Sequence, residues 1–206
     1  MTTIFLVRHG QTTWNRARIF RGRAEVRLSE LGRKEAECVA RSLADAPIRQ
    51  VYTSPLHRAR ETADIVAEPH GAEVIPDPAF IDIDFGGWTE FWEFEVERRF
   101  PKEYELWRTA PHLVRFPRGE SLDDVRRRAV ARLYELAAAR KDEQIALVSH
   151  RVVLKLLLCE ARGLDNTHFN EMRVATGAIC RVDSADGSLR VVEENRVCHL
   201  PHKPLE

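Results

Sequence analysis

Residues 4–10 read Ile4-Phe5-Leu6-Val7-Arg8-His9-Gly10, four apolar residues followed by two basic residues and a glycine. A continuous apolar run of this length, ended by a turn residue, is typical of a strand that is buried on both faces of a parallel sheet. Residues 145–148 repeat the pattern and end in Ser149-His150. The sequence therefore predicts two buried strands, each with a histidine at its carboxyl end.

Strands and helices alternate along most of the chain. Further strands are expected at 50–53 and 72–75, and a β-hairpin is expected from 178–182 and 189–193. This alternation predicts the α/β class, as a three-layer α/β/α sandwich with a mostly parallel central sheet.

Apolar residues at helical spacing predict four helices, of which three follow a serine and the fourth covers residues 152–158. Ser29 is expected to precede one helix, and Ser121 resembles the start of a capping box. Ser54 is expected to be the N-cap of another helix, with Pro55 at its first position, where the missing N–H costs nothing.

The middle of the chain is rich in aromatic residues: nine of the 16 lie between Phe80 and Trp107. We expect residues 1–206 to form a single domain with a small helical lid inserted at about 88–116. The aromatic side chains there either contact a ligand or pack the lid onto the body; they are Phe91, Trp92, Phe94, Phe100, Tyr104 and Trp107. The basic run Arg126-Arg127-Arg128 is expected to be a solvated helix face.

Composition excludes several classes of protein. The 32 basic and 32 acidic residues balance, so no long-range attraction to nucleic acid or to an anionic membrane is expected. No apolar run approaches the roughly 18–20 residues of a membrane span, and Met1 to Thr3 lead directly into a strand rather than a signal peptide. The four cysteines are far apart, with no Cys-x-x-Cys pair, which favours reduced thiols. A cytoplasmic location and no cofactor are expected.

Basic side chains are expected to gather at one edge of the sheet. Ligands of open parallel sheets bind outside the carboxyl ends of the strands, where His9 and His150 are predicted. Arg8 adjoins His9, and the helix that carries Arg58 follows a strand that ends at the same edge. Two arginines and two histidines suit a compact dianion, because guanidinium groups match phosphate oxygens. The arginines would repel a divalent cation, so no metal site is expected.

Six stretches, taken in order, resemble the histidine phosphatase superfamily, in the branch of phosphoglycerate mutases and related phosphatases. A single Arg-His-Gly would be weak, whereas ordered blocks from residue 4 to about 160 are specific. The blocks are Leu6–Thr12 with Trp14-Asn15, Leu28–Gly32, Ser54–Ala63, Asp82–Trp88, Gly119–Ser121 and Val148–His150.

The resemblance implies that His9 is a nucleophile, which attacks phosphorus and forms a phosphohistidine that water hydrolyses. It also implies that Arg8, Arg58 and His150 hold the phosphoryl oxygens and stabilise the transition state. Asn15 would supply a further hydrogen bond to the phosphate.

The proton donor for the leaving group is commonly a glutamate in this family. Alignment on the Phe-Gly-x-Trp block places Asp82 at that position. Asp84 is the alternative, although an aspartate there is also typical of a turn.

The chain departs from the family pattern near the expected site. Arg151 follows His150 where glycine is usual, Arg21 precedes Gly22 where glutamine is common, and Thr89-Glu90 replaces Glu-Gly. Arg21, Gly22 and Arg151 are therefore candidate substrate-binding residues, and Arg21 favours a more acidic substrate.

These features predict a metal-independent phosphatase of the histidine acid phosphatase type, acting on a small phosphomonoester. The mutases carry an extended segment with a Glu-Arg-His-Tyr-Gly-like block, which is absent here. The alternatives are a phosphoglycerate mutase and a phosphate-binding regulatory protein that has lost catalysis. The motifs leave the substrate and the oligomeric state open.

Overall fold

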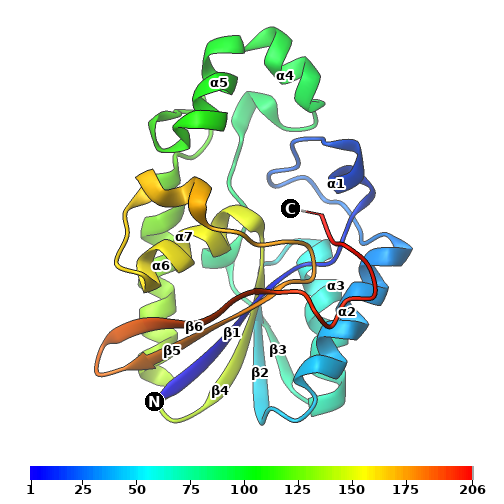
Figure 1. The fold of residues 1–206 in the computed structure, drawn as a ribbon, viewed down its shortest axis with the longest axis vertical. Coiled ribbons are helices and arrows are strands. Elements are labelled where there is room, and N and C mark those ends of the chain that lie inside the picture. The colour runs from blue at the N-terminus through cyan, green and yellow to red at the C-terminus, as the bar shows by residue number, and fades with distance from the viewer. Residues whose placement is uncertain (206) are drawn as a thin grey trace.

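A six-stranded sheet runs through the centre of this computed structural model, which describes residues 1–205 (Figure 1). Its order is β3-β2-β4-β1-β5-β6. The first four strands along this order are parallel to one another, β5 is antiparallel to β1, and β6 is antiparallel to β5. The strands are β1 (Thr2–Arg8), β2 (Ile48–Thr53), β3 (Glu73–Pro76), β4 (Gln144–Ser149), β5 (Ile179–Ala185) and β6 (Ser188–Arg196).

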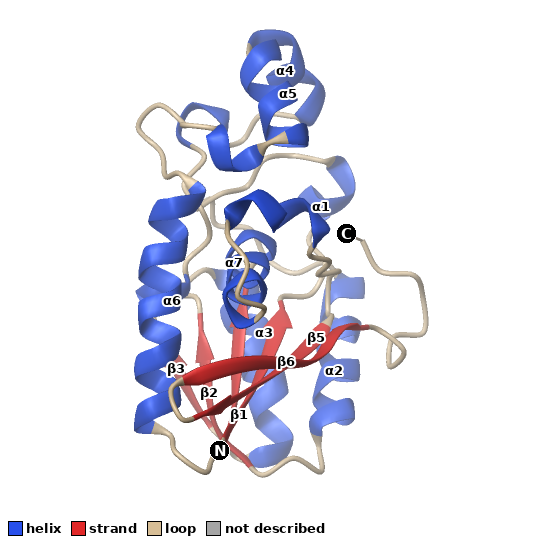
Figure 2. Ribbon diagram, turned by 60° about the vertical axis from the view of Figure 1, so that its left-hand side comes forward, coloured by secondary structure: helices blue, strands red, loops and turns tan. Residues whose placement is uncertain are grey.

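Helices cover both faces of the sheet (Figure 2). One layer contains α2 (Glu30–Leu43) and α3 (His57–Ala67), and the other contains α6 (Leu122–Ala139) and α7 (Arg151–Ala161). The predicted three-layer sandwich with a mostly parallel sheet is confirmed.

Strand β1 shows why a continuous apolar run was needed. All seven of its residues are buried. Because side chains alternate across a strand, Ile4 and Leu6 pack in the core with α6 and α7, whereas Phe5 and Val7 pack in the core with α2 and α3. Both faces of the strand are therefore apolar.

Two of the three serine caps are confirmed. Ser29 accepts a hydrogen bond from the Gly32 N–H, and Ser121 forms a capping box with Asp124. The prediction for Ser54 was wrong, because α3 begins at His57. The Ser54 N–H bonds to the Val148 carbonyl at 3.0 Å, which extends β2 by one residue and delays the helix.

The 88–116 segment contains α4 (Glu93–Arg99), α5 (Pro101–Thr109) and the 3-10 turn Pro111–Leu113. It lies beyond the carboxyl ends of the parallel strands, near the short helix α1 (Thr13–Ala17) (Figure 1). The Phe20 N–H donates to the Phe91 carbonyl, and the Glu93 N–H donates to the Arg18 carbonyl. These bonds join the segment to the loop after α1.

The aromatic side chains of this segment divide into two groups. Tyr104 and Trp107 are buried in the same core as α6 and α7, and the partly buried Phe91 and Phe100 pack against it, so these four residues pack the segment onto the body. Trp92 and Phe94 are 44% and 62% exposed, and neither lines the cavity described below.

The prediction of a solvated basic face at 126–128 was wrong for two of its three residues. Arg126 pairs with Glu160 at 2.6 Å, and Arg128 pairs with Glu120 at 2.9 Å. Only the Arg127 side chain, 75% exposed, is solvated. Positions 126 and 128 lie beside the buried stripe of α6, where a guanidinium reaches over the edge of the helix to neighbouring segments.

The sequence predicts reduced thiols and contains no apolar run long enough to span a membrane. Cys38, Cys159 and Cys180 are buried, Cys198 is exposed, and none forms a disulfide. Across residues 1–205, no helix is both long enough and apolar enough to cross a membrane.

Helix α2 approaches the loop after β1 so closely that only glycine fits at two positions. A Cβ on Gly32 would lie 2.0 Å from the Gln11 carbonyl oxygen, and a Cβ on Gly10 would lie 2.1 Å from the Gly32 carbonyl oxygen. Both obstacles are backbone atoms, which cannot rotate away.

We predict that Gly32→Ala lowers the free energy of unfolding by about 1–3 kcal/mol or more, because overpacking typically costs this much. Urea unfolding of the variant measures this loss. Gly87→Ala is the matched control, because a Cβ there meets no atom within 4 Å. Equal stabilities of the two variants would contradict the close approach.

Candidate active site

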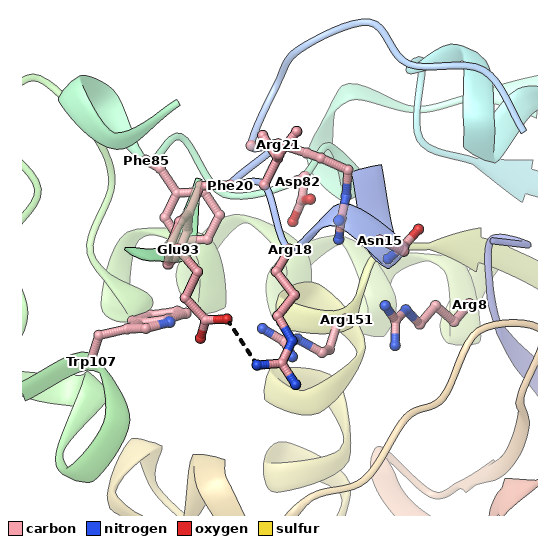
Figure 3. Close-up of a pocket in the computed structure, with 12 residues that line it drawn as sticks. Arg8, Asn15, Arg18, Phe20, Arg21, Asp82, Phe85, Glu93, Trp107 and Arg151 are labelled. Atoms are coloured by element: carbon pink, nitrogen blue, oxygen red, sulfur yellow. Dashed lines mark ion pairs between the residues drawn. The ribbon is translucent and has the colours of Figure 1, made fainter. Parts of the chain in front are cut away.

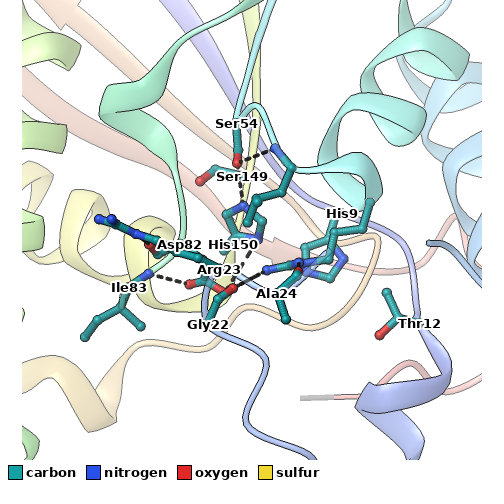
Figure 4. Close-up of polar contacts among 12 residues, drawn as sticks. His9, Thr12, Gly22, Arg23, Ala24, Ser54, Asp82, Ile83, Ser149 and His150 are labelled. Carbon is teal, nitrogen blue, oxygen red and sulfur yellow. Dashed lines mark hydrogen bonds and ion pairs between the residues drawn. The ribbon is translucent and has the colours of Figure 1, made fainter. Parts of the chain in front are cut away.

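The two histidines predicted at strand ends lie side by side. Parallel pairing sets Arg8 opposite Ser149, and the His9 N–H donates to the Ser149 carbonyl at 3.1 Å. The ring centroids of His9 and His150 are 5.2 Å apart, and both residues are at most 1% exposed (Figure 4).

One hydrogen bond sets the tautomer of His9. Its Nδ1 lies 2.7 Å from the Gly10 carbonyl oxygen. A carbonyl can only accept, so Nδ1 carries the proton and Nε2 of the neutral ring carries a lone pair. The ring therefore has a nucleophilic nitrogen.

The residue mistaken for a helix cap sets the orientation of His150. Ser54 Oγ accepts from the Leu56 N–H at 3.3 Å and lies 2.7 Å from Nε2 of His150. Because the Leu56 N–H occupies a lone pair of the hydroxyl oxygen, this arrangement favours donation of the Ser54 proton to Nε2. Nδ1 of His150 is then a donor; it lies 3.7 Å from Oδ2 of Asp82.

Two buried arginines belong to the same cluster: Arg8 ends β1, and Arg58 lies in the first turn of α3. Arg58 donates through Nη1 to the Ala24 carbonyl, and through Nη2 to the Gly22 carbonyl and to Asp82. Arg8 donates through Nη1 to the Val174 carbonyl at 2.7 Å.

Some buried donors of this cluster have no hydrogen-bond partner among the described residues. They are Nε of Arg8, Nε of Arg58 and Nδ1 of His150. Buried polar groups are nearly always paired, so these donors are suited to the oxygen atoms of a bound anion.

Burial and positive charge act together on the histidines. Burial, followed by the charges of Arg58 and Arg8, lowers the pKa of His9 well below its ordinary value. The pKa of His150 is lowered by burial and by Arg58. Both rings are thus neutral at pH 7, as a nucleophile and a hydrogen-bond donor require.

A cavity of about 330 Å³ opens beside this cluster (Figure 3). Of the residues expected in the site, Arg8, Asn15, Arg21, Gly22, Asp82 and Arg151 line it, whereas His9, Arg58 and His150 do not. Burial and the charge of Arg58 lower the pKa of Arg21 to about 9. Arg21 is still charged at pH 7, and together with Arg8 and Arg151 it makes the cavity wall strongly cationic.

Asn15 serves the local structure through one end of its side chain. Its Oδ1 accepts from the N–H and the hydroxyl of Thr12, which caps α1. The amide nitrogen of Asn15 is left as the group that can donate to a ligand in the cavity.

The structure separates the two candidate acids. Asp82 lines the cavity and contacts Arg58 at 3.2 Å. Asp84 does not line it, and its Oδ1 accepts from the Gly86 N–H at 2.8 Å, as an aspartate in a turn does.

Sequence reasoning missed several residues of the site. Arg18 and Glu93 form an ion pair of 3.7 Å at the cavity wall (Figure 3). No motif marks them, because Arg18 follows α1 and Glu93 begins α4, and only the folded chain brings these segments together. Phe20 and Phe85 also line the cavity, and the ring of Phe20 meets that of Phe85 edge-on at 5.1 Å.

Among the described residues, no three His, Cys, Asp or Glu side chains gather as metal ligands would. Asp82 is instead surrounded by arginines. The donor set of the site suits an anion better than a divalent cation.

Comparisons with known proteins show the family of the chain. Phosphoserine phosphatase 1 of Hydrogenobacter thermophilus is 30% identical, over 97% of this chain and 95% of that protein. A protein of Erwinia tasmaniensis named "Probable phosphoglycerate mutase GpmB" is 32% identical, over 89% and 85%. The solved structure of Bacillus stearothermophilus YhfR matches with a TM-score of 0.93 and 29% identity, over 97% of this chain and 99% of that one. Residues 4–197 match the family model of the histidine phosphatase superfamily (branch 1), and the chain belongs to that superfamily.

Proposed function

We propose that this chain is a metal-independent phosphatase that hydrolyses a small phosphomonoester through a phosphohistidine at His9. One observation carries the proposal: the His9 ring keeps a lone pair on Nε2, lies 5.2 Å from the His150 ring and feels the charges of Arg58 and Arg8, while Arg8, Arg58 and His150 each keep a buried donor without a partner among the described residues. These are the groups that a phosphoryl transfer needs, a nucleophile with donors for the equatorial oxygens.

In the first step, Nε2 of His9 attacks phosphorus and the bond from phosphorus to the ester oxygen breaks. Asp82 gives its proton to the departing alkoxide, which leaves as an alcohol. The donors of Arg8, Arg58, His150 and the Asn15 amide hold the phosphoryl oxygens.

In the second step, water attacks the phosphohistidine. The Asp82 carboxylate takes a proton from that water, and the nitrogen–phosphorus bond breaks. Inorganic phosphate leaves, His9 recovers its lone pair, and Asp82 is again protonated.

The proposal includes independence from metal ions, since arginines supply the positive charge that a metal would otherwise supply at a phosphoryl group. It also includes action in the cytoplasm, where thiols such as Cys38, Cys159 and Cys180 stay reduced.

We further propose that the substrate carries a second acidic group. Arg8, Arg18, Arg21 and Arg151 line the cavity together with Asp82 and Glu93. Because Asp82 carries the proton that it donates in the proposed mechanism, only Glu93 offsets the four arginines, and the remaining positive charge exceeds what one phosphoryl dianion balances. Arg151, at the first position of α7, is the arginine assigned to that second group. The H. thermophilus relative is named a phosphoserine phosphatase, and phosphoserine has such a group.

Residues 88–116 act in this proposal as a lid over the substrate, with Glu93 and Trp107 at the cavity wall. Hydrolysis is proposed rather than the mutase reaction, because the chain lacks the extended segment of the dedicated mutases. Interconversion of phosphoglycerates stimulated by 2,3-bisphosphoglycerate would instead favour the mutase.

We predict that p-nitrophenyl phosphate is hydrolysed in excess EDTA and that His9→Ala abolishes turnover, because no other group can accept the phosphoryl. A phosphate-release assay of both proteins checks this. Retention of most activity by the variant would exclude the phosphohistidine, and loss of wild-type activity in EDTA would exclude metal independence.

We predict that Arg21→Gln moves the acid limb of kcat/KM to higher pH. The Arg21 charge contributes to the lowered pKa of His9, so its removal lets His9 take up a proton at higher pH and lose its lone pair. The profiles are measured with one substrate, so that the titration of the substrate cancels. Arg16→Gln, an equal charge change on the exposed face of α1, should leave the limb in place; equal profiles for both variants would refute the coupling.

We predict that Arg151→Gln raises KM about tenfold or more for phosphoserine or 3-phosphoglycerate, the effect of losing a hydrogen bond to a charged group. KM for p-nitrophenyl phosphate should change little, because that ester has no second acid. Arg16→Gln again serves as the control. A KM that rises equally for esters with and without a second acidic group would mean that Arg151 does not bind that group.

A further inference from the structure

Arg128 of α6 is fully engaged, although its neighbour Arg127 is solvated. Its Nε and Nη2 donate to the two carboxylate oxygens of Glu120 at 2.9 and 3.0 Å. Its Nη1 donates to the Ala79 carbonyl at 2.7 Å, and Nη2 also donates to the Asp82 carbonyl at 3.2 Å. The Arg128 and Glu120 side chains are only 20% and 19% exposed.

These contacts converge on the segment that carries the proposed proton donor. Between the 3-10 turns Pro78–Phe80 and Gly86–Trp88, residues 81–85 belong to no helix or strand. Arg128 binds the backbone at Ala79 and at Asp82, and Glu120 binds it at Asp84, by accepting from the N–H at 3.1 Å. A second, more exposed arginine, Arg23, reaches Glu120 at 3.1 Å.

The carboxylate of Asp82 binds only one backbone group of its own segment. Its contacts are with Arg58, His150 and the N–H of the next residue, Ile83. Burial opposes ionisation of Glu120, but the hydrogen bonds and charge of Arg128, together with the Asp84 N–H and the charge of Arg23, lower the pKa of Glu120. The pair is therefore ionic, and a bidentate ionic pair has a fixed geometry.

We propose that Arg128, through Glu120 and the carbonyls of Ala79 and Asp82, is a positioning residue for proton donation by Asp82. The assignment rests on the proposed function. A general acid must lie within hydrogen-bond distance of the leaving oxygen, and an irregular segment reaches that accuracy only when other groups fix it.

The test compares two leaving groups. p-Nitrophenolate leaves without a proton, whereas the alkoxide of glycerol 2-phosphate needs one. We expect Arg128→Gln to lower kcat/KM, which reports the step in which the leaving group departs, about tenfold more for glycerol 2-phosphate than for p-nitrophenyl phosphate, part of the effect of general acid catalysis. Arg127→Gln is the matched control, since it removes the same charge one residue away and breaks only the pair with Asp124.

Asp82→Asn separates the inference from the proposed function. It should show the largest preference for the good leaving group, and adding Arg128→Gln to it should not change that preference further, because both changes act on one step. If Arg128→Gln does not fold, Arg128→Lys and Glu120→Gln give the same comparison, since the first keeps the charge, the second keeps the size of the side chain, and both lose the bidentate ionic pair.

Equal losses on the two substrates in Arg128→Gln, beside a leaving-group preference in Asp82→Asn, would overturn the positioning role alone. The absence of any preference in Asp82→Asn would remove Asp82 as the acid, and the role of Arg128 with it. A wild type that hydrolyses neither ester would refute the phosphatase itself.

Discussion

The parallel pairing of β1 with β4 is the constraint on which the rest of the site depends. It places Arg8 opposite Ser149, so that the next residue of each strand is a histidine at the same edge of the sheet. A slip of one residue would turn every side chain of a strand to the other face. The two apolar cores above and below β1 prevent such a slip, and the stability of the sandwich thus fixes the distance between His9 and His150.

The second constraint is the burial of positive charge. A buried cation is costly unless hydrogen bonds compensate it, and here backbone carbonyls supply much of that compensation. Arg58 uses the carbonyls of Gly22 and Ala24, and Arg8 uses that of Val174. Carbonyls hold the guanidinium groups without neutralising them, which leaves positive charge and unpartnered donors for an anion. The same charge lowers the pKa of His9 and favours its lone pair.

The cavity wall is assembled from parts of the chain that are remote in sequence. The contributors are Arg8, Asn15, residues 18–22, Asp82 with Phe85, Glu93, Trp107 and Arg151. Backbone hydrogen bonds connect residues 18–20 with residues 90–93. The loop that carries Arg21 and the 88–116 segment therefore form one continuous wall of the cavity. Asp82 lies on an irregular segment that α6 holds from behind through Arg128.

By itself, the sequence determined the sandwich, the strand ends and the ordered blocks of the family. Apolar runs such as Ile4–Val7 can be stable only between two layers, and the residue that follows a strand end is fixed by covalent connection. His9, Arg8, Arg58 and His150 could be placed at one edge for this reason. Ser29 and Ser121 were also readable, because a cap bonds to residues two or three positions away.

Only the tertiary structure decided what depends on contacts between distant segments. The sequence predicted Ser54 as a helix cap. In the structure its N–H donates to Val148 of β4, which continues the pairing of β2 by one residue, and its hydroxyl contacts His150. The run 126–128 looked like a solvated face, but two of its guanidinium groups meet carboxylates far along the chain or beyond the helix end. No sequence motif identified Arg18 and Glu93 as residues of the cavity wall. Such long side chains reach several ångströms from their backbone, so their partners are set by which segments the packed core brings near, and no local pattern records that.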